Sequence, residues 1–515
     1  MTELDVSASS SSSSDVSRPV LPVVKPIAFN PKIYKLNRTR LADRLKPTLS
    51  ATSPSLVLFR GGKQQERNET DHEELFRQES SFAWAFGVKE PNCVGVINPV
   101  SGEATVFFPR YPAEYALWMG ELRTLESFKL EYQVDHVYWL DELEQVVHKI
   151  KPTTVLTLHG GLNADSGRRV DQPLEEAFWS EYHVQHTAYH HVCELRLIKT
   201  ELELDLLRQV NRASCFAHAK VMQQCRPGMY EFQLESTFQH ECYYHTGCRL
   251  TSYTSICACG GNASALHYGH AGRPNTAQIA HHQMLLLDMG GEGHFYASDI
   301  TNSFPSTGKF SPAQEQIYSI VLAMQWHVLG KIRPGMYYLD LQLDCYRILL
   351  TMLKDKVGLL QGDVEEMMVE NLGGVFMPHG LGHSMGVDTH DVGGRPEFPE
   401  EAEKRSPDQL GLKSLRLTRP LRAGMVVTVE PGLYFIGYLL DGALKNSRTS
   451  KFFVKKRLGE FRDFGGVRLE DDVVVGANGI ENLTRQPRTV KDVEQWMAGK
   501  ITDLNHLQAP WSPKF

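Results

Sequence analysis

The sequence predicts a chain of mixed helices and strands, folded into two domains that meet near residue 190. Three observations predict this. Strand-like and helical segments alternate over residues 25–190, long amphipathic helices follow, and several strand-like apolar runs in the second half end in a carboxylate. The chain has 515 residues, of which 42% are hydrophobic, so it is long enough to bury a substantial core.

The first predicted domain is an α/β unit. Residues 95–109 read as a β-hairpin, because two apolar runs flank a glycine-containing turn. The segment TTVLTLHGG at 153–161 is typical of a strand that ends in glycines, and residues 111–149 show helical spacing. The Ser-rich stretch at residues 1–20 is predicted to be a disordered tail outside this unit.

The second half opens with a long helix. Apolar residues recur at steps of three and four over residues 193–225, and the sequence Arg-Pro-Gly-Met at 226–229 ends this pattern. A second helix of the same kind is predicted over 312–333, and it also ends in Arg-Pro-Gly-Met, at 333–336. The repeated combination suggests an internal duplication.

The bulk composition excludes several classes of protein. A net charge of -7 argues against a nucleic-acid partner, and no apolar run approaches the roughly 18–20 residues of a membrane span. The first residues show neither a secretory signal nor a transit peptide. Nine scattered cysteines, an odd number, are typical of reduced thiols, and we therefore expect a cytoplasmic protein.

Two aspartates follow apolar runs in the stretch LLLDMGGEGHFYASDITNSF. Asp288 comes directly after four apolar residues, and Asp299 ends a second strand-like run, FYAS, beyond a Gly-rich turn. Burying a carboxylate is unfavourable unless it is paired or holds a metal. Acids of a solvated turn would explain the pattern equally well. If the stretch is a hairpin, Asp288 lies opposite or near Asp299.

Three further segments place polar residues beside apolar runs. Glu430 ends the β-branched run MVVTV, and Glu470 interrupts the run GGVRLEDDVVV, where period-two alternation puts Arg468 on the same face. His379, His383 and His390 lie among glycines at 376–394. Each of these also has a simpler explanation when taken singly. The histidines would be ordinary loop residues, Glu430 a turn acid before proline, and Glu470 part of a solvated strand end.

Taken together, the polar residues share the property of ending or interrupting segments that should be core. Four carboxylates and one imidazole around one point would hold two divalent cations, because carboxylates can bridge ions about 3.5–4 Å apart. A ligand set of four oxygens and one nitrogen suits Mn, Co or Zn better than a metal that prefers thiolates. The sequence therefore predicts a dinuclear metal site in the second half.

Several of these segments also carry a family resemblance. The chain resembles the metal-dependent pita-bread peptidases of metallopeptidase family M24, and among them the Xaa-Pro dipeptidase (prolidase) branch. The resemblance extends over about residues 25–495. It rests on FRQESSFAWAFGVKEP (76–91), FFPRYPAEYALWMG (107–120), LHYGHAG (266–272), DMGGEGHFYASDITNSFP (288–305), FMPHGLGHSMGVDTHDVGG (376–394), SLRLTRPLRAGMVVTVEPG (414–432) and FGGVRLEDDVVV (464–475).

The resemblance implies an α+β fold. A creatinase-like α/β domain would cover residues 25–190, and a pita-bread catalytic domain with pseudo-twofold repeats would cover 191–495, followed by a C-terminal tail at 496–515. It also implies a homodimer, in which the segment around Trp118 reaches the partner's site.

The resemblance further implies roles for single residues. The metal ligands would be Asp288, Asp299, His383, Glu430 and Glu470. Asp299 and Glu470 would bridge two ions, most commonly Mn(II). Residues on the substrate side, or next to the ligands, would be Tyr253, His267, His379, His390, Arg416 and Arg468.

The implied reaction is hydrolysis of Xaa-Pro dipeptides, which recycles proline from peptide and collagen breakdown. The scissile bond is a tertiary amide without an N–H. Two cations would acidify a shared water to hydroxide. Glu430 would carry a proton from that water to the proline nitrogen, and His379 or His390 would stabilise the oxyanion. Arg416 would clamp the substrate's carboxylate in a bidentate manner, which would exclude longer peptides.

Two other functions remain possible. An aminopeptidase P-type enzyme cuts Xaa-Pro bonds in longer peptides with the same metal site, and substrate length would distinguish it. A pita-bread protein that has lost its metal and binds partners should lack ligands, whereas all five are present here.

Overall fold

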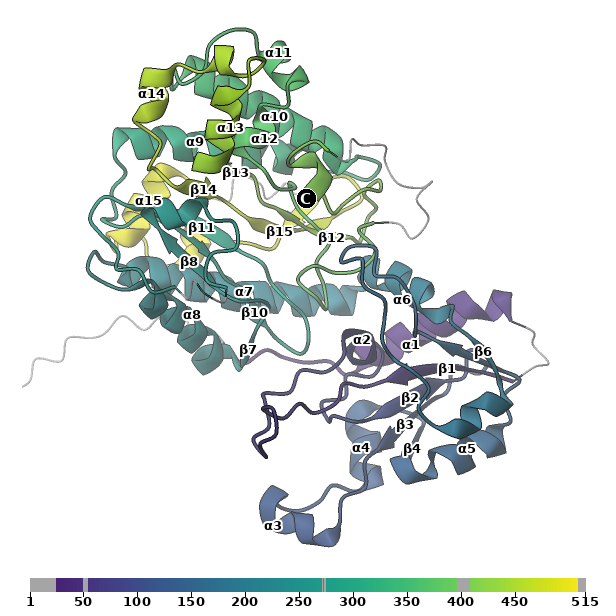
Figure 1. The fold of residues 1–515 in the computed structure, drawn as a ribbon. Helices are drawn as coiled ribbons and strands as arrows, with labels where there is room; N and C mark the ends of the chain where they lie inside the picture. Colours follow the sequence, from purple (N-terminus) through teal and green to yellow (C-terminus); the bar gives the residue numbers. More distant parts are fainter. Residues whose placement is uncertain (1–24, 50–53, 271, 273–274, 396–407, 508–515) are drawn as a thin grey trace, which may run out of the picture.

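The fold is that of a computed structural model, which describes residues 25–49, 54–270, 272, 275–395 and 408–507. Figure 1 shows a smaller domain, built around one sheet, beside a larger domain in which helices surround several short sheets. The predicted Ser-rich tail at 1–20 lies outside the described residues, as do the last eight residues of the chain.

The smaller domain is built on a six-stranded mixed sheet in the order β4-β3-β2-β1-β5-β6. The predicted hairpin at 95–109 is confirmed, since β2 and β3 pair antiparallel, and the predicted strand at 153–161 is β5. The strands are β1 (Ser55–Arg60), β2 (Val94–Ile97), β3 (Ala104–Phe108), β4 (His136–Trp139), β5 (Thr154–Thr157) and β6 (His183–Gln185).

The helical prediction for residues 111–149 is partly wrong. The segment holds three helices, but strand β4 lies between the second and the third and pairs parallel with β3. Its sequence HVYW is β-branched and aromatic, and the partner strand decides its conformation. The helices of this domain are α1 (Lys32–Leu45), α2 (Ser80–Phe86), α3 (Ala116–Met119), α4 (Leu125–Tyr132), α5 (Leu143–Ile150) and α6 (Ala188–Leu197).

The larger domain repeats a helix–turn–helix unit. α7 (Glu201–Gln224) begins at a capping box formed by Thr200 and Glu203, which separates it from α6 within the predicted helix 193–225. The predicted helix at 312–333 is α9 (Pro312–Lys331), capped in the same way by Ser311 and Gln314. After each Arg-Pro-Gly-Met turn a second helix packs on the first: α8 (Glu231–Thr246) on α7, and α10 (Tyr338–Asp355) on α9.

Short antiparallel sheets lie between these helix pairs (Figure 1). Strands β11, β9 and β8 form one sheet, β12, β15 and β16 a second, and β13 with β14 and β10 with β7 form two-stranded ribbons. Their bounds are β7 (Leu250–Thr251), β8 (Ile256–Cys259), β9 (Met284–Asp288), β10 (Gly291–Glu292), β11 (Thr301–Pro305), β12 (Val426–Val429), β13 (Gly432–Tyr434), β14 (Gly466–Arg468), β15 (Asp471–Val475) and β16 (Ile480–Asn482).

The remaining helices are short and lie outside these sheets. They are α11 (Val364–Val369), α12 (Gly373–Phe376), α13 (Gly437–Lys445), α14 (Lys455–Gly459) and α15 (Val490–Met497). In the described parts of the chain, no helix is both long and apolar enough to cross a membrane.

The two domains share a hydrophobic core and a buried ionic cluster. Leu207 of α7 and Met385 of the larger domain pack in one cluster with residues of β1, α1 and α2. Arg196 of α6 donates to Asp391 at 2.5 Å and to Asp388 at 2.7 Å. The smaller domain is therefore packed firmly against the loop that carries the histidines.

Candidate metal centre

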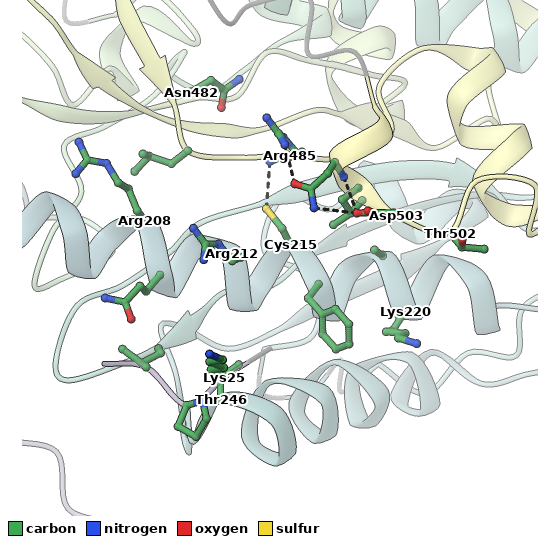
Figure 2. Close-up of a pocket in the computed structure, with 18 of the residues that line it drawn as sticks. Lys25, Arg208, Arg212, Cys215, Lys220, Thr246, Asn482, Arg485, Thr502 and Asp503 are labelled. Atoms are coloured by element: carbon green, nitrogen blue, oxygen red, sulfur yellow. Dashed lines mark hydrogen bonds between the residues drawn. The ribbon is translucent and has the colours of Figure 1, made fainter. Parts of the chain in front are cut away.

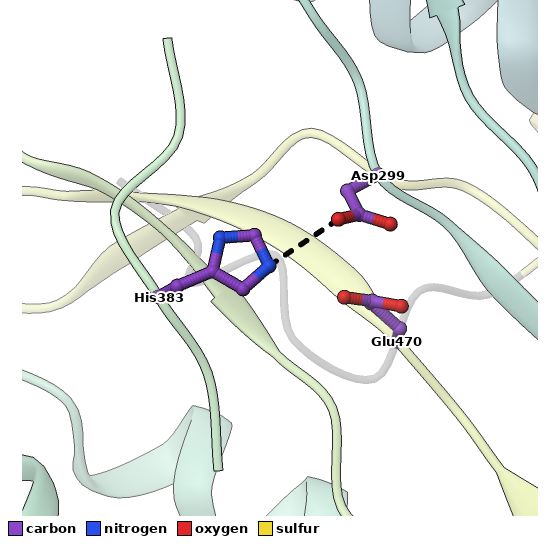
Figure 3. Close-up of side chains that lie close together, drawn as sticks. All are labelled: Asp299, His383 and Glu470. Carbon is purple, nitrogen blue, oxygen red and sulfur yellow. Dashed lines mark ion pairs between the residues drawn. The ribbon is translucent and has the colours of Figure 1, made fainter. Parts of the chain in front are cut away.

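Three side chains from distant parts of the sequence converge in the larger domain (Figure 3). Ligand atoms of Asp299, His383 and Glu470 all lie within 4.8 Å of one another, and all three residues are buried. Asp299 precedes β11, His383 lies in the loop between α12 and β12, and Glu470 lies between β14 and β15. An imidazole and two carboxylates so close together form a possible metal site.

His383 presents one ring nitrogen to the carboxylates. Its Nε2 lies 3.3 Å from Asp299 Oδ2 and 3.5 Å from Glu430 Oε1. Its Nδ1 lies 3.1 Å from the Ser384 carbonyl oxygen, and because a carbonyl can only accept, Nδ1 carries the proton of the neutral ring. Nε2 then offers a lone pair to the cluster, as a metal ligand would.

A glycine allows the loop of His383 to approach β12. A Cβ on Gly382 would lie 2.1 Å from the carbonyl oxygen of Thr428. The His383 backbone N–H donates to Thr428 Oγ1 at 3.0 Å. The strand that ends at Glu430 therefore also fixes the position of His383.

Asp288, the last residue of β9, has two strong donors. Tyr253 donates its hydroxyl to Asp288 Oδ1 at 2.6 Å, and Arg468 donates from Nη2 to Oδ2 at 2.6 Å. Asp288 pairs with Thr301 in the antiparallel β9–β11 ladder. Asp299 therefore lies two residues before the residue that faces Asp288. This register confirms that Asp288 and Asp299 lie near each other, as predicted.

Two details of the predicted strands are wrong. The run FYAS is not a strand, because His294 and Phe295 have positive φ angles of 47° and 73° in the turn, and β11 starts after Asp299. The strand predicted through Glu470 is interrupted at Leu469 and Glu470, between β14 and β15. In both places the predicted metal ligand, Asp299 or Glu470, lies outside the regular ladder.

Arg468 and Glu470 nevertheless face the same site. Thr301 Oγ1 donates to Glu470 Oε2 at 2.6 Å and accepts from Arg468 Nε at 3.1 Å. Arg468 also donates from Nη1 to the Tyr434 hydroxyl at 2.8 Å. The Arg468 guanidinium therefore links the β11-β9-β8 sheet, through Asp288 and Thr301, to Tyr434 in the β13–β14 ribbon.

The carboxylates outnumber the cations around them. Burial, reinforced by the neighbouring acids, raises the pKa of Asp299 and of Glu470 well above the ordinary range. Burial also raises the pKa of Glu430 to about 7, although His383 and Arg468 act in the opposite direction. Such a set of oxygen donors and one nitrogen fits hard or borderline divalent cations, which would compensate the charge.

The other predicted histidines lie around the cluster. His379 Nδ1 is 2.8 Å from the Gly380 carbonyl oxygen and its Nε2 is 3.0 Å from the Tyr434 hydroxyl, so both nitrogens have partners. Burial, aided by Arg468, lowers the pKa of His379 to about 3. The His390 ring packs edge-on against His383, with 4.5 Å between centroids, and His267 is exposed.

Arg416 has an unexpected partner. Its Nη1 donates to Asp165 Oδ2, which belongs to the smaller domain. Sequence reasoning missed Asp165, and also Thr301 and Tyr434, which join Arg468 to the cluster. Thr301 could have been found, since it lies two residues after Asp299; Asp165 is 251 residues from Arg416 and gives no local signal.

A separate cavity of about 970 Å³ lies along α7 (Figure 2). Lysine and arginine side chains from α7 and from segments near the two ends of the described chain line this cavity. None of the lining residues is a predicted site residue. The main ones are Lys25, Arg208, Arg212, Lys220 and Arg485. Arg208 is paired with Glu481 at 2.7 Å. This cavity is distinct from the metal centre.

A buried cluster of carboxylates with an imidazole, held between short sheets and helix pairs, is typical of a metal-dependent enzyme. Comparisons with known proteins agree. Residues 205–477 match the model of metallopeptidase family M24, and residues 34–157 match the aminopeptidase P N-terminal domain. The chain belongs to metallopeptidase family M24, and the predicted α+β pita-bread fold is confirmed.

Relatives and solved structures cover nearly the whole chain. The chain is 47% identical to human Xaa-Pro dipeptidase over 91% of its own length and 93% of the relative's. It is 31% identical to a probable Xaa-Pro aminopeptidase of Aspergillus fumigatus, over 90% and 97%. Aminopeptidase P of Escherichia coli with the inhibitor Pro-Leu has a TM-score of 0.72 and 27% identity, over 92% and 99%. The protein is therefore a metal-dependent peptidase.

Proposed function

We propose that this protein is an Xaa-Pro dipeptidase, which hydrolyses dipeptides with a C-terminal proline. The observation that carries the proposal is the 47% identity to human Xaa-Pro dipeptidase over 91% of the chain. The similarity to aminopeptidase P structures is weaker, at 27% identity, although the fold is shared. The segment of Arg416 packs on the histidine loop, where a Cβ on Gly380 would lie 2.8 Å from the Leu415 Cα, and a guanidinium there fits a substrate with a free carboxylate close to the scissile bond.

We propose that Asp288, Asp299, His383, Glu430 and Glu470 hold two divalent cations, most commonly Mn(II). When bound, such cations supply Lewis acidity and acidify water. Tyr253 and Arg468 orient Asp288, and Thr301 orients Glu470. Hydrogen bonds of this kind fix ligand geometry before the cations arrive.

Glu430 is the proposed proton carrier. Its carboxylate is a hydrogen-bond acceptor beside the cluster, so it can take a proton from the attacking water and pass it on. The proline nitrogen of a tertiary amide becomes a good leaving group only when it is protonated. Glu430 Oε1, 3.5 Å from His383 Nε2, lies at the edge of the cluster where this transfer is needed.

A histidine stabilises the developing oxyanion in this proposal. The ring nitrogens of His379 already bond to Gly380 and Tyr434, which favours His390 as the direct donor. His379 then keeps Tyr434 and Arg468 in position. We further propose that His267 and Arg416 contact the substrate's proline end.

The test is hydrolysis of three peptides by chelator-treated protein, with and without added Mn(II). Cleavage of Gly-Pro, but not of Gly-Pro-Gly or Arg-Pro-Pro, is the expected result, and it should require metal. Cleavage of Arg-Pro-Pro would instead assign an aminopeptidase P-type activity. No cleavage of any of the three peptides by metal-loaded protein would refute the proposed Xaa-Pro specificity.

We also propose that the chain forms a homodimer through α3. Figure 1 shows α3 projecting from the smaller domain, and Leu117 and Trp118 on it are 83% and 82% exposed. Exposed apolar clusters of this kind mark contact surfaces. Light scattering should give a dimer for the wild type and a monomer for Trp118→Ala.

We propose a cytoplasmic location as well. It is consistent with the nine cysteines, none of which forms a disulfide.

A further inference from the structure

Arg416 is held by the smaller domain. Its Nη1 forms an ion pair with Asp165 Oδ2, at the tip of a turn in which Asn163 Oδ1 accepts from the backbone N–H groups of Asp165 and Ser166 at 3.0 and 3.2 Å. Leu162 and Arg169 pair across the base of this turn. Asp165 is therefore presented on a rigid hairpin that reaches the larger domain.

The Asp165 carboxylate is closed off from water at this contact. Its side chain is 8% exposed, against 32% for Arg416, and Asp165 Oδ1 is buried without a hydrogen-bond partner among the described residues. Moving Arg416 away would leave a buried carboxylate with no cation, which is strongly unfavourable. Arg416 should therefore stay on Asp165 when substrate binds.

One edge of the guanidinium remains available. Within the described parts of the chain, Asp165 is the hydrogen-bond partner of the Arg416 side chain, and it uses Nη1 alone. A guanidinium has five N–H donors, so Nε and Nη2 can still bind a carboxylate in a bidentate manner. The Arg416 segment lies beside the loop that carries the candidate substrate histidines. A Cβ on Gly380, next to His379, would lie 2.8 Å from the Cα of Leu415. The Thr418 backbone N–H donates to the Gly394 carbonyl oxygen at 3.1 Å.

We propose that Asp165 is a positioning residue that fixes the orientation of Arg416 for the C-terminal carboxylate of the substrate. This inference rests on the proposed function and adds a specificity residue from the smaller domain. A long arginine side chain on a loop loses rotamer freedom on binding a ligand, and Asp165 imposes that loss in advance. A chain that continued beyond proline would meet the Arg416–Asp165 pair, so the smaller domain would help to exclude longer peptides.

The first test compares Asp165→Ala and Asp165→Asn with the wild type on Gly-Pro. Asp165→Ala removes the ion pair that holds Arg416. Because the Arg416 side chain regains its rotamer freedom, KM should rise about tenfold while kcat stays within about twofold of the wild type. Asp165→Asn keeps an oxygen acceptor for Nη1, so its KM should stay near that of the wild type. Asp171→Ala, an exposed acid after the same hairpin, is the matched control and should change nothing.

The same variants separate positioning from two other roles. If Asp165 merely competed with the substrate for Arg416, both Asp165 variants would lower KM. If Asp165 served only folding, Asp165→Ala would lower kcat and the unfolding midpoint together. In an Arg416→Ala background, Asp165→Ala should cause no further rise in KM; an additive rise would overturn the proposal.

A binding measurement keeps this test independent of hydrolysis. Calorimetry on chelator-treated protein compares Gly-Pro with its C-terminal amide, which lacks the carboxylate. The wild type should bind Gly-Pro about tenfold more tightly, and Asp165→Ala should lose most of this preference. Equal affinities in the wild type, or an unchanged preference in Asp165→Ala, would refute the role of Asp165, whether or not the wild type hydrolyses Gly-Pro.

Discussion

Two buried clusters of charge in this protein differ in their balance. At the domain interface, Arg196 and Lys199 face Asp388 and Asp391 at 2.5–3.1 Å. Burial alone would raise the pKa of Asp388, but Arg196 and Arg77 lower it below its usual range. In the metal centre, four carboxylates gather around Arg468, and the pKa of Asp299, Glu430 and Glu470 is raised.

The difference separates a structural cluster from a functional one. Each aspartate of the interface cluster pairs with two cationic side chains, so the charges stabilise each other and need nothing from solution. The metal centre has four carboxylates around the single guanidinium of Arg468, and divalent cations would supply the missing positive charge. Removing a carboxylate should therefore have opposite consequences for stability in the two clusters.

The largest expected effect comes from Asp299→Asn in the metal centre. Hydrolysis of Gly-Pro should fall by about 10³-fold or more, because the proposed bridging ligand is lost. The metal-free variant should be at least as stable as the metal-free wild type, since it removes a carboxyl group whose charged form is disfavoured by burial and by Asp288. Kinetics, bound-metal analysis and urea unfolding in chelator would measure this. A marked loss of metal-free stability would show that Asp299 is compensated like the interface acids.

Asp391→Ala should have the opposite effect on stability. It leaves Arg196 and Lys199, whose side chains are 2% and 1% exposed, without Asp391, and should cost about 3–5 kcal/mol of unfolding free energy. Urea unfolding of chelator-treated protein is the measurement. Glu365→Ala, which breaks the exposed Arg347–Glu365 pair, is the control and should leave the midpoint unchanged. Equal midpoints for both variants would contradict the comparison.

The sequence predicts these two clusters unequally well. Asp288 and Glu430 are recognisable because apolar runs lead directly to them, and the structure has them at the ends of β9 and β12. The FYAS run misleads, because its composition favours a strand while the tight turn at His294 and Phe295 prevents one. The pairing of Arg196 with Asp391 joins residues 195 positions apart, and no local pattern encodes such a contact.

The pH dependence of stability should distinguish the metal-free from the metal-loaded protein. The pKa of Glu430 is raised from 4.5 to about 7 by folding, so its stabilising contribution is present below pH 4.5 and is lost as pH rises through 7. Metal-free protein should lose on the order of 3 kcal/mol between pH 5 and pH 8 from this group. With Mn(II), stability should instead rise, since cations bind the ionised carboxylates.

Urea unfolding at four pH values, in chelator and in Mn(II), would measure both curves. Glu430→Gln provides the matched variant, because its amide does not titrate. Its metal-free stability should fall less between pH 5 and pH 8 than that of the wild type. If the metal-free stability of the wild type and of Glu430→Gln changed with pH in the same way, Glu430 would be ionised over the whole range from pH 5 to pH 8. It would then resemble Asp388 at the interface, whose pKa is lowered.

The smallest expected effect concerns a neutral donor to the metal centre. Tyr253→Phe removes the hydroxyl that donates to Asp288 Oδ1 at 2.6 Å while it keeps the ring. Affinity for Mn(II) should fall about 10–100-fold, as is usual when a hydrogen bond to a ligand is lost. Tyr318→Phe is the control, because Tyr318 is a buried tyrosine whose hydroxyl donates to the Arg488 carbonyl oxygen. It should lower stability slightly and leave the Mn(II) dependence of hydrolysis unchanged. If both variants weakened metal binding alike, the orientation of Asp288 by Tyr253 would have no specific role.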